Sequence, residues 1–395
     1  MSDTIPHGYK MTEVGIIPED WEVKNLGELC HAIVDGTHYT PTYVDNGVPF
    51  YSVENVTADN FRDTKFISEE EHSYLTQRCK PEKNDILLTR IGSLGATKLI
   101  TWDVNASIYV SLALLKTNEK ILPTYLYNYT QFYRFVLDIE KRSLLNATPK
   151  KINMGDIGAV PIPLPPTLTE QRAIAEALSD VDEQITALDE AITKKHDIKQ
   201  GAMQRLLTGE ERLPGFSGEW ENDTISNLAS ITTGDKNTQD NIEDGKYLFF
   251  VRSANIERIN SYTFDGEAVL TAGDGVGTGK IFHYIDGKFD FHQRVYKISD
   301  FTDRLDGYYF YLYFSTYFYD RIMSMTAKSS VDSVRMEMIA GMHIPLPFPT
   351  EQRAIATILK DMDAEIGTLE AQREKTVALK TGMMQELLTG KTRLI

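Results

Sequence analysis

The chain has 395 residues, of which 42% are hydrophobic and 25% charged, and this length exceeds what one hydrophobic core normally supports. Cys30 and Cys79 are too few for a disulfide framework, and no apolar run is long enough for a membrane span. We therefore expect two or three domains, no membrane segment and a cytoplasmic location, and the N-terminal segment lacks the apolar core of a signal peptide.

The net charge of −16 argues against a simple nucleic-acid binder, because phosphate contacts need a basic surface. Acidic residues outnumber basic ones in residues 1–160, 161–213 and 214–342, and the two are equal in residues 343–395. Any contact with nucleic acid must therefore come from local clusters such as Lys150–Lys151, or from partner subunits that supply most of the positive charge.

Residues 1–160 are predicted to form a mixed α/β block that is rich in short strands. Asn46-Gly47 is a turn signal that leads into an apolar, strand-like segment. A second such segment, DILLTRIGSLG from Asp85 to Gly95, combines a short apolar strand with a glycine turn.

Residues 161–213 are predicted to contain a long helix. The proline-rich segment PIPLPPTL precedes it, and Thr167 with Glu170 three residues later forms a capping-box pattern. Gly209 suits the left-handed position just past the helix C-terminus. Apolar residues at alternating spacings of four and three predict a coiled-coil seam. The seam residues are Ile174, Leu178, Val181, Ile185, Leu188 and Ile192.

Residues 214–342 repeat the features of the first block more faintly. Glu267–Gly277 parallels Asp85–Gly95, and Asp244-Gly245 parallels the turn signal at Asn46-Gly47. A second block of the same mixed α/β type is therefore expected.

Each block also contains an aromatic, helix-like segment, which begins at Tyr125 in the first block and at Tyr308 in the second. Stacking on bases is one use for such residues. Packing in the core is favoured, because the aromatic residues are too dense for all of them to be exposed.

Residues 343–395 repeat the first long helix without a gap. The sequence from Thr350 to Leu394 matches that from Thr169 to Leu213 at one constant offset, and Gly390 repeats the helix stop. The register of the seam is also repeated. Its residues in this copy are Ile355, Leu359, Met362, Ile366 and Leu369.

A helix with one apolar stripe needs a partner, and the other copy is the nearest candidate. Because the second block separates the two helices, an antiparallel pairing returns the chain without a long linker. Each helix would be about 58 Å long at 1.5 Å per residue. Within the helices, Gly201 and Gly382 each cost about 1 kcal/mol relative to alanine, which close packing of another backbone would explain.

The predicted fold class is mixed α/β (α+β). Two globular blocks are separated by two long antiparallel coiled-coil helices in a pseudo-two-fold tandem repeat. From the repeat alone, a coiled coil that only dimerises two proteins remains an alternative.

Catalytic motifs are largely absent from the sequence. Gly273–Lys280 resembles a phosphate-binding loop, but its spacing departs from G-x-x-x-x-G-K-[ST], and Ile281 stands where Ser or Thr would bind magnesium. No H-E-x-x-H, G-x-S-x-G or Asn-Pro-Pro-aromatic motif occurs, so we expect a non-catalytic chain without its own cofactor. The spacings of the possible metal ligands match no paired motif. These ligands are Cys30, His31, His38, His72 and Cys79.

The most specific segments are IPLPPTLTEQRAIAEAL and its copy HIPLPFPTEQRAIATIL, the helix ends LLTGEERL and LLTGKTRL, and the opening GYKMTEVGIIPEDWEVKNLGEL. Together they resemble the specificity subunit of type I restriction-modification systems, over essentially the whole chain. DGTHYTPTYVDNGVPFYSVENV and TTGDKNTQDNIEDGKYLFFVRSANIERI resemble, less specifically, the target recognition domains of that family.

The resemblance implies that residues 1–160 and 214–342 are target recognition domains, each reading half of a split sequence in double-stranded DNA. Residues 161–213 and 343–395 would be the spacer helices that fix the gap. Half-sites one helical turn apart are about 34–36 Å between centres, a separation that helices of this length can set.

The family also implies partners for this chain. Its helices dock two methyltransferase subunits, which bind S-adenosylmethionine and methylate adenine in each half-site. Restriction subunits, which are translocase-nucleases that use ATP and Mg²⁺, join that core. The acidic charge of this chain is then less of an obstacle, because the partners can hold much of the duplex.

Side chains near the glycine turns, and on the loops before the Pro-Leu-Pro segments, are the candidates for DNA contact. Arginine and lysine can bond guanine edges, and they equally often bind phosphates. For any single residue, a solvated surface position is the alternative. The candidates are Thr37, Tyr39, Arg90, Ser93, Lys98, Lys150 and Lys151 in the first block, and Lys236, Arg252, Thr278, Lys280, Lys328 and Arg335 in the second.

Other classes of protein remain open at this point. A stand-alone DNA-binding regulator with two reading heads would bind tightly without partners and should have a basic face. A coiled-coil scaffold would show no salt-sensitive binding to DNA. A fused restriction-methylation enzyme would need catalytic motifs, and their absence nearly excludes it.

Overall fold

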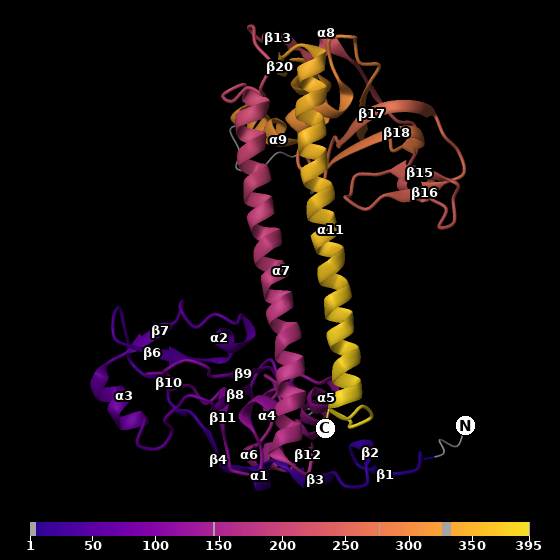
Figure 1. Ribbon diagram of the computed structural model, residues 1–395. Helices are drawn as coiled ribbons and strands as arrows, with labels where there is room; N and C mark the ends of the chain where they lie inside the picture. The colour runs from indigo at the N-terminus through magenta and orange to yellow at the C-terminus, as the bar shows by residue number, and fades with distance from the viewer. Residues whose placement is uncertain (1–4, 145–146, 276, 326–332, 395) are drawn as a thin grey trace. The chain divides into compact units, whose positions relative to one another are not determined.

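Figure 1 shows the computed structural model, which describes residues 5–144, 147–275, 277–325 and 333–394. Contacts divide the chain into two compact units, residues 1–189 with 372–395 and residues 190–371. Each unit thus combines one globular block with parts of both long helices, whereas the sequence predicted four consecutive segments. No helix in the described ranges is long and apolar enough to cross a membrane.

In the described part of the first unit, short strands form two four-stranded sheets, β4-β11-β8-β9 and β10-β6-β7-β5, and two strand pairs. The β8 segment is buried along its whole length, as expected for the apolar run before the first glycine turn. The strands are β1 (Tyr9–Thr12), β2 (Gly15–Pro18), β3 (Glu22–Asn25), β4 (Cys30–Asp35), β5 (Tyr43–Val44), β6 (Val48–Tyr51), β7 (Lys65–Ile67), β8 (Ile86–Thr89), β9 (Thr97–Leu99), β10 (Ser107–Ile108), β11 (Leu112–Thr117) and β12 (Pro161–Leu164).

The first aromatic segment forms two helices that pack into the core of this unit. Tyr125, Tyr129 and Phe135 are at most 1% exposed and belong to a cluster that also contains Ile174 and Leu178. The prediction of core packing is therefore confirmed. The helices are α1 (Leu26–Leu29), α2 (Val53–Thr57), α3 (Glu69–Leu75), α4 (Pro123–Thr130), α5 (Tyr133–Arg142) and α6 (Met154–Gly158).

In the second unit, the described strands form a six-stranded sheet, β14-β19-β17-β18-β15-β16, and the pair β13-β20. The second aromatic segment is helix α9, whose Phe310, Phe314 and Phe318 are buried, so core packing is confirmed here too. The elements are β13 (Glu221–Thr224), α8 (Ile225–Leu228), β14 (Ser230–Thr233), η1 (Thr238–Asp240), β15 (Tyr247–Phe250), β16 (Glu257–Ile259), β17 (Phe264–Ala272), β18 (Phe282–Phe291), β19 (Val295–Ser299), α9 (Gly307–Ser324), α10 (Met336–Ala340) and β20 (His343–Leu346).

The two units share a strand plan and differ at one strand. β18 pairs with β17 along its first part and runs parallel to β15 at its end. In the first unit, β9 pairs with β8 while the separate strand β10 runs parallel to β6. Residues 100–106 interrupt the strand there, so the continuous sheet of the second unit becomes two sheets in the first.

The long helices are α7 (Leu168–Thr208) and α11 (Pro349–Leu387), which confirms both helical predictions. Within each unit they run antiparallel. In the first unit Lys380 pairs with Asp182 at 2.6 Å, and in the second Lys199 pairs with Asp363 at 2.5 Å. The offset that relates the two helical sequences also relates these two ion pairs, so the repeat is conserved in contacts as well as in sequence.

The repeated Glu-Gln of the TEQR motif joins each helix start to its own block. Gln171 accepts a hydrogen bond from the backbone of Leu122 and donates one to that of Lys120. Gln352 accepts one from the backbone of Asp306 and donates one to that of Arg304. Both glutamines are at most 1% exposed, so they satisfy buried backbone groups beside the aromatic helices.

The helix ends largely follow the sequence predictions. Gly209 and Gly390 have φ of +73° and +66°, the left-handed conformation expected after a helix C-terminus. Thr167 accepts a hydrogen bond from the backbone of Glu170, but the Glu170 carboxylate bonds Arg393 and does not complete the capping box.

The expected close packing at the helical glycines is wrong. An added Cβ would meet nothing within 4 Å at Gly382, and only a flexible arginine end at Gly201. The proposed seam residues are all buried or half-buried.

Candidate nucleic-acid interface

The glycine turn after β8 is joined by backbone hydrogen bonds to the loop before α6. Arg90 donates its backbone N–H to the carbonyl of Ser111 at 2.9 Å and accepts one from Ile152 at 3.0 Å. Gly92 donates to the carbonyl of Lys150 at 2.8 Å. The two loops that were predicted to carry DNA contacts are therefore adjacent in the first unit.

The second unit repeats this arrangement. Gly273 donates its backbone N–H to the carbonyl of Arg294, and Val334 donates to that of Gly273, both at 2.7 Å. By their pairing, Gly273, Arg294 and Val334 correspond to Arg90, Ser111 and Ile152. We call this shared hydrogen-bonded arrangement the backbone frame of each unit.

Two glycines bring a further loop against each backbone frame. An added Cβ at Gly36 would overlap the carbonyl oxygen of Ile108, and one at Gly234 would overlap that of Phe291. Residues just after these glycines form isolated parallel bridges. Thr37, one residue after Gly36, pairs with Tyr109, and Lys236, two residues after Gly234, pairs with His292. Only glycine permits such a close approach of two backbones, so both loops are fixed in equivalent positions.

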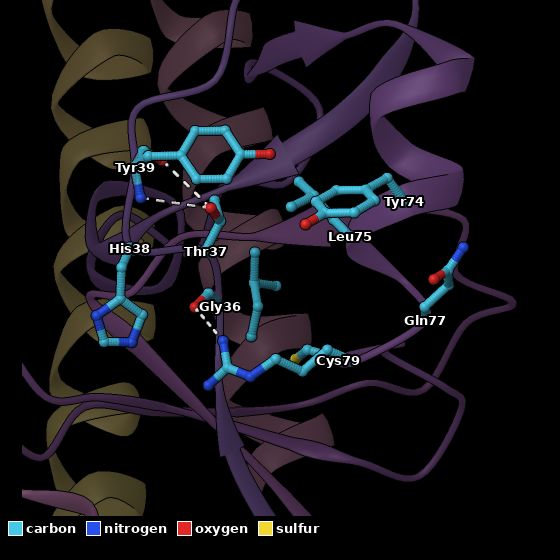
Figure 2. Close-up of a pocket in the computed structure, with 10 residues that line it drawn as sticks. Gly36, Thr37, His38, Tyr39, Tyr74, Leu75, Gln77 and Cys79 are labelled. Atoms are coloured by element: carbon cyan, nitrogen blue, oxygen red, sulfur yellow. Dashed lines mark hydrogen bonds between the residues drawn. The ribbon is translucent and has the colours of Figure 1, made fainter.

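Beside this loop of the first unit lies a pocket of about 370 Å³. Figure 2 shows Thr37, His38 and Tyr39 on one wall and Tyr74, Leu75 and Gln77 on the other. Thr37 is buried, with 7% of its surface exposed, whereas Tyr39 is 48% exposed. Of these two predicted residues, Tyr39 is thus the more accessible to a ligand.

The buried carboxylate of Asp35 organises charged side chains next to this pocket. Arg78 donates to Asp35 and to the carbonyl of Gly36, and His38 Nε2 lies 2.9 Å from the carboxylate. Arg90 Nη1 is 3.1 Å from Asp35 Oδ2, and its guanidinium also donates to two backbone carbonyls. Arg90 is only 8% exposed. An internal role is therefore favoured over the predicted DNA contact.

The other predicted residues of the first unit differ in their freedom to bind. Ser93, Lys150 and Lys151 are exposed on the backbone frame. Lys98 is 2.5 Å from Asp59, so its charge is already paired. A groove of about 620 Å³ opens beside the frame, and Ile91, Gly92, Ser111 and Pro149 are part of its lining.

In the second unit the predicted residues surround the glycine turn after β17. Arg252 Nη1 lies 3.0 Å from Asp274 Oδ1, and Lys280 lies over the ring of Tyr319 at 4.8 Å. Thr278 is buried and donates to the carbonyl of Gly275, so it holds the turn. Lys236 pairs with Asp235, and Arg335 is exposed at the start of α10. Lys328 lies outside the described residues.

Three charged residues at these faces were missed by the sequence reasoning: Arg78, Asp274 and Arg294. Arg294 Nη1 is 3.5 Å from Asp274 Oδ2, so one carboxylate bridges Arg252 and Arg294. Of these three residues, only Asp274 had a signal in the sequence, because it lies inside the glycine turn Gly273–Lys280. Arg78 and Arg294 follow segments without a recognisable motif.

The cysteine and histidine residues considered as metal ligands are not brought together. In the described residues, no group of three or more His, Cys, Asp and Glu could hold a metal ion. Burial raises the pKa of Cys30 to about 12 and that of Cys79 to about 11, so both are neutral thiols at neutral pH. His31 and His72 bond the carbonyl of Thr117 and the hydroxyl of Ser107 instead.

Similarity to known proteins defines the class of this molecule. The family model of the type I restriction modification DNA specificity domain matches residues 18–198 and 217–379, so the chain belongs to this family. It is a type I restriction-modification specificity subunit with two DNA specificity domains, a component that is not catalytic.

A relative and two solved structures are similar to this chain over almost its whole length. The type I restriction enzyme MjaVIII specificity subunit of Methanocaldococcus jannaschii is 26% identical over 96% of this chain and 94% of its own length. The S subunit of a type I system from M. genitalium has a similar fold, with a TM-score of 0.65, 14% identity, and coverage of 93% of this chain and 96% of that one. A chain solved in work on complex assembly and conformational transition of the type I system has a TM-score of 0.58, 15% identity, and coverage of 95% and 99%.

Proposed function

We propose that each unit reads one half of a split target in double-stranded DNA, through its backbone frame and the loops fixed against it. The repetition of the frame carries this proposal. The same backbone hydrogen bonds recur in both units, while the side chains on them differ, as two readers of unlike half-sites require. Exposed groups on these faces include Tyr39, Ser93 and Lys150–Lys151 in the first unit and Arg252, Lys280 and Arg335 in the second.

The paired helices α7 and α11 set the gap between the half-sites and dock two methyltransferase subunits. The repeated helix sequence supports this, because the side chains that are identical in both copies can each contact one copy of a partner. Those subunits bind S-adenosylmethionine and methylate adenine, and restriction subunits that use ATP and Mg²⁺ join the complex. The complex acts on DNA in the cytoplasm. Its partners supply the positive charge that this chain, at −16, lacks.

The experiment is co-expression with the methyltransferase subunit of the same restriction-modification system, followed by mapping of N6-methyladenine across the host genome. We expect a two-part motif with a fixed gap, which appears only when this chain is present. A soluble, copurifying complex that adds no methylation would contradict the proposal and favour a scaffold. Tight sequence-specific binding by the chain alone would favour a two-headed regulator.

A further inference from the structure

The backbone frame of the second unit carries two arginines that share one carboxylate. Asp274 accepts from Arg252 at 3.0 Å and lies 3.5 Å from Arg294. The side chain of Arg252 is 46% exposed and that of Arg294 is 64% exposed, whereas the side chain of Asp274 is 24% exposed. The carboxylate is therefore the inner member of the cluster, and the two guanidinium groups are its accessible part.

The backbone beneath this cluster is held on several sides. Gly273 bonds the carbonyl of Arg294, and an added Cβ there would lie 2.9 Å from that oxygen. The backbone N–H of Arg294 donates to Nδ1 of His292, a residue that is 4% exposed. Burial, followed by the charge of Arg252, lowers the pKa of His292, which agrees with a neutral ring that accepts this bond. The backbones that carry Asp274 and Arg294 are thus held in place.

The equivalent positions in the first unit are uncharged. Tyr109 donates its backbone N–H to Tyr51, as His292 does to Phe250. By this register, Arg252 corresponds to Val53 and Arg294 to Ser111. There the backbone of Val53 donates to the Ser111 hydroxyl at 3.2 Å. The frame is kept and the side chains are exchanged, as expected at positions that determine specificity.

The shared carboxylate favours base reading over simple phosphate binding. An acidic group between two arginines reduces their attraction for a phosphate, whereas it fixes the direction of each guanidinium fork. A guanidinium has five donors, and each of these contacts uses one nitrogen. The remaining donors match the O6 and N7 acceptors that guanine presents in the major groove, and fixing the forks beforehand lowers the entropy cost of binding.

We infer that Arg252 and Arg294, positioned by Asp274, read at least one G·C pair in the half-site of the second unit. This inference rests on the proposed function and adds the base and the residues that recognise it. Asp274 is a positioning residue, because it acts through the two arginines.

The first test compares methylation motifs of complexes that contain wild-type chain, Arg252→Ala, Arg294→Ala or Asp274→Asn. We expect a guanine position in one half of the motif to become degenerate, with a roughly ten- to hundredfold loss of discrimination, while the other half stays unchanged. Arg304→Ala is the matched control. Arg304 is 48% exposed and bonds two carboxylates on the β13 strand, outside the backbone frame, so its motif should stay intact.

The second test measures binding of purified complexes to a duplex that carries the motif, with single guanines replaced by 7-deazaguanine to remove N7. Replacement of one particular guanine should lower the affinity of the wild-type complex for the duplex. The same replacement should lower the affinity of the Arg252→Ala or Arg294→Ala complex only slightly, because the arginine that contacts N7 is already missing. This test also applies if a variant methylates too weakly for its motif to be mapped.

Three results would overturn the inference. The half-site could contain no G·C pair, every variant could keep the wild-type motif, or the variants could lose affinity equally on matched and mismatched duplexes, which marks phosphate contacts. In each case the wild-type complex would still methylate a two-part motif. Loss of all methylation by a soluble wild-type complex would instead contradict the proposed function, and this inference with it.

Discussion

Arg393 and Glu170 form an ion pair with two hydrogen bonds, although 223 residues separate them in the chain. The Glu170 carboxylate is almost fully buried, with 1% exposure. Arg393 also donates to Asp20 at 3.0 and 3.1 Å. The end of the chain is therefore tied both to the start of α7 and to the N-terminal segment of the first unit.

The second unit contains the equivalent pair. In the two helical repeats, Glu351 is equivalent to Glu170, and Arg212 is equivalent to Arg393. Arg212 donates to Glu351 at 2.6 and 2.8 Å, and the carboxylate is again 1% exposed. This explains why each helical repeat keeps both a Glu near its start and an Arg after its glycine stop. Each glutamate is bonded by the arginine of the other copy.

We predict that Arg393→Ala destabilises the first unit by about 2–4 kcal/mol, and that Arg212→Ala destabilises the second unit. Each substitution leaves a buried carboxylate without its cation, and the partial exposure of the arginine moderates the cost. Urea denaturation of the purified chain measures the effect. Lys391→Ala is the control, because its ion pair with Glu386 is exposed and should contribute little. Equal midpoints for Arg393→Ala and Lys391→Ala would refute the prediction.

Arg90→Ala should lower stability and leave the recognised sequence unchanged. Arg90 and Asp35 are both buried, so loss of the guanidinium leaves a buried carboxylate with only Arg78 and His38, at a cost of about 2–4 kcal/mol. The denaturation midpoint and the methylation motif are measured on the same variant. Lys151→Ala, an exposed residue of the same frame, should show the opposite pattern, with normal stability and weaker binding to DNA. If the Arg90→Ala complex instead has normal stability and a motif that is degenerate at one position, Arg90 contacts DNA directly.

The contrast between the long helices and Arg90 shows what the sequence could predict. The seam at Leu178 and Leu359 follows from a local period that needs no knowledge of the partner, and both residues are fully buried. The aromatic helices were also predictable, because residues such as Phe314 cannot all remain in water. The ion pair of Arg90 could not be predicted, because its partner, Asp35, lies 55 residues away and nothing near Arg90 in the sequence signals that carboxylate.

The backbone frames show the same limit at the candidate site. The glycine turns and the loops before α6 and α10 were identified from local signals, and they do lie together. The bridge between Arg252 and Arg294 was not predictable, because it joins the ends of strands that are far apart in sequence through a third residue, Asp274. Contacts of this kind depend on the sheet register, which no local pattern specifies.

Gly36→Ala and Gly234→Ala should each disable the reading of one half-site only. The added methyl group would force the loop away from the carbonyl of Ile108 or Phe291, a strain of about 1–3 kcal/mol confined to one frame. The motif of each variant complex is mapped, and we expect degeneracy in opposite halves. Gly155→Ala is the matched control, because an added Cβ there meets nothing within 4 Å. Identical motif changes in Gly36→Ala and Gly234→Ala complexes would contradict independent reading by the two units.

Lys297→Met should stabilise the second unit at pH 7 by about 1 kcal/mol. Lys297 is 7% exposed, with its ammonium 3.4 Å from the centre of the Phe264 ring. Methionine removes the cost of burying the charge, and the lost attraction to the ring offsets part of that gain.

The pH dependence of this gain tests its cause. Burial lowers the pKa of Lys297 in the folded chain below its ordinary 10.5. Between the lowered pKa and 10.5 the unfolded chain therefore binds more protons than the folded chain, and the stability of the wild-type chain rises with pH. The advantage of Lys297→Met should therefore shrink as the pH approaches 10.5. Lys288→Met is the control with the opposite sign, because a hydrogen bond with Tyr262 raises the pKa of Lys288. Its wild-type stabilisation is complete below the ordinary pKa and is lost as the pH rises through the raised value. Over pH 7 to 10.5, denaturation midpoints of the three chains should show a shrinking advantage for Lys297→Met and a constant difference between wild type and Lys288→Met. Parallel curves for the two variants would exclude a buried charge at Lys297.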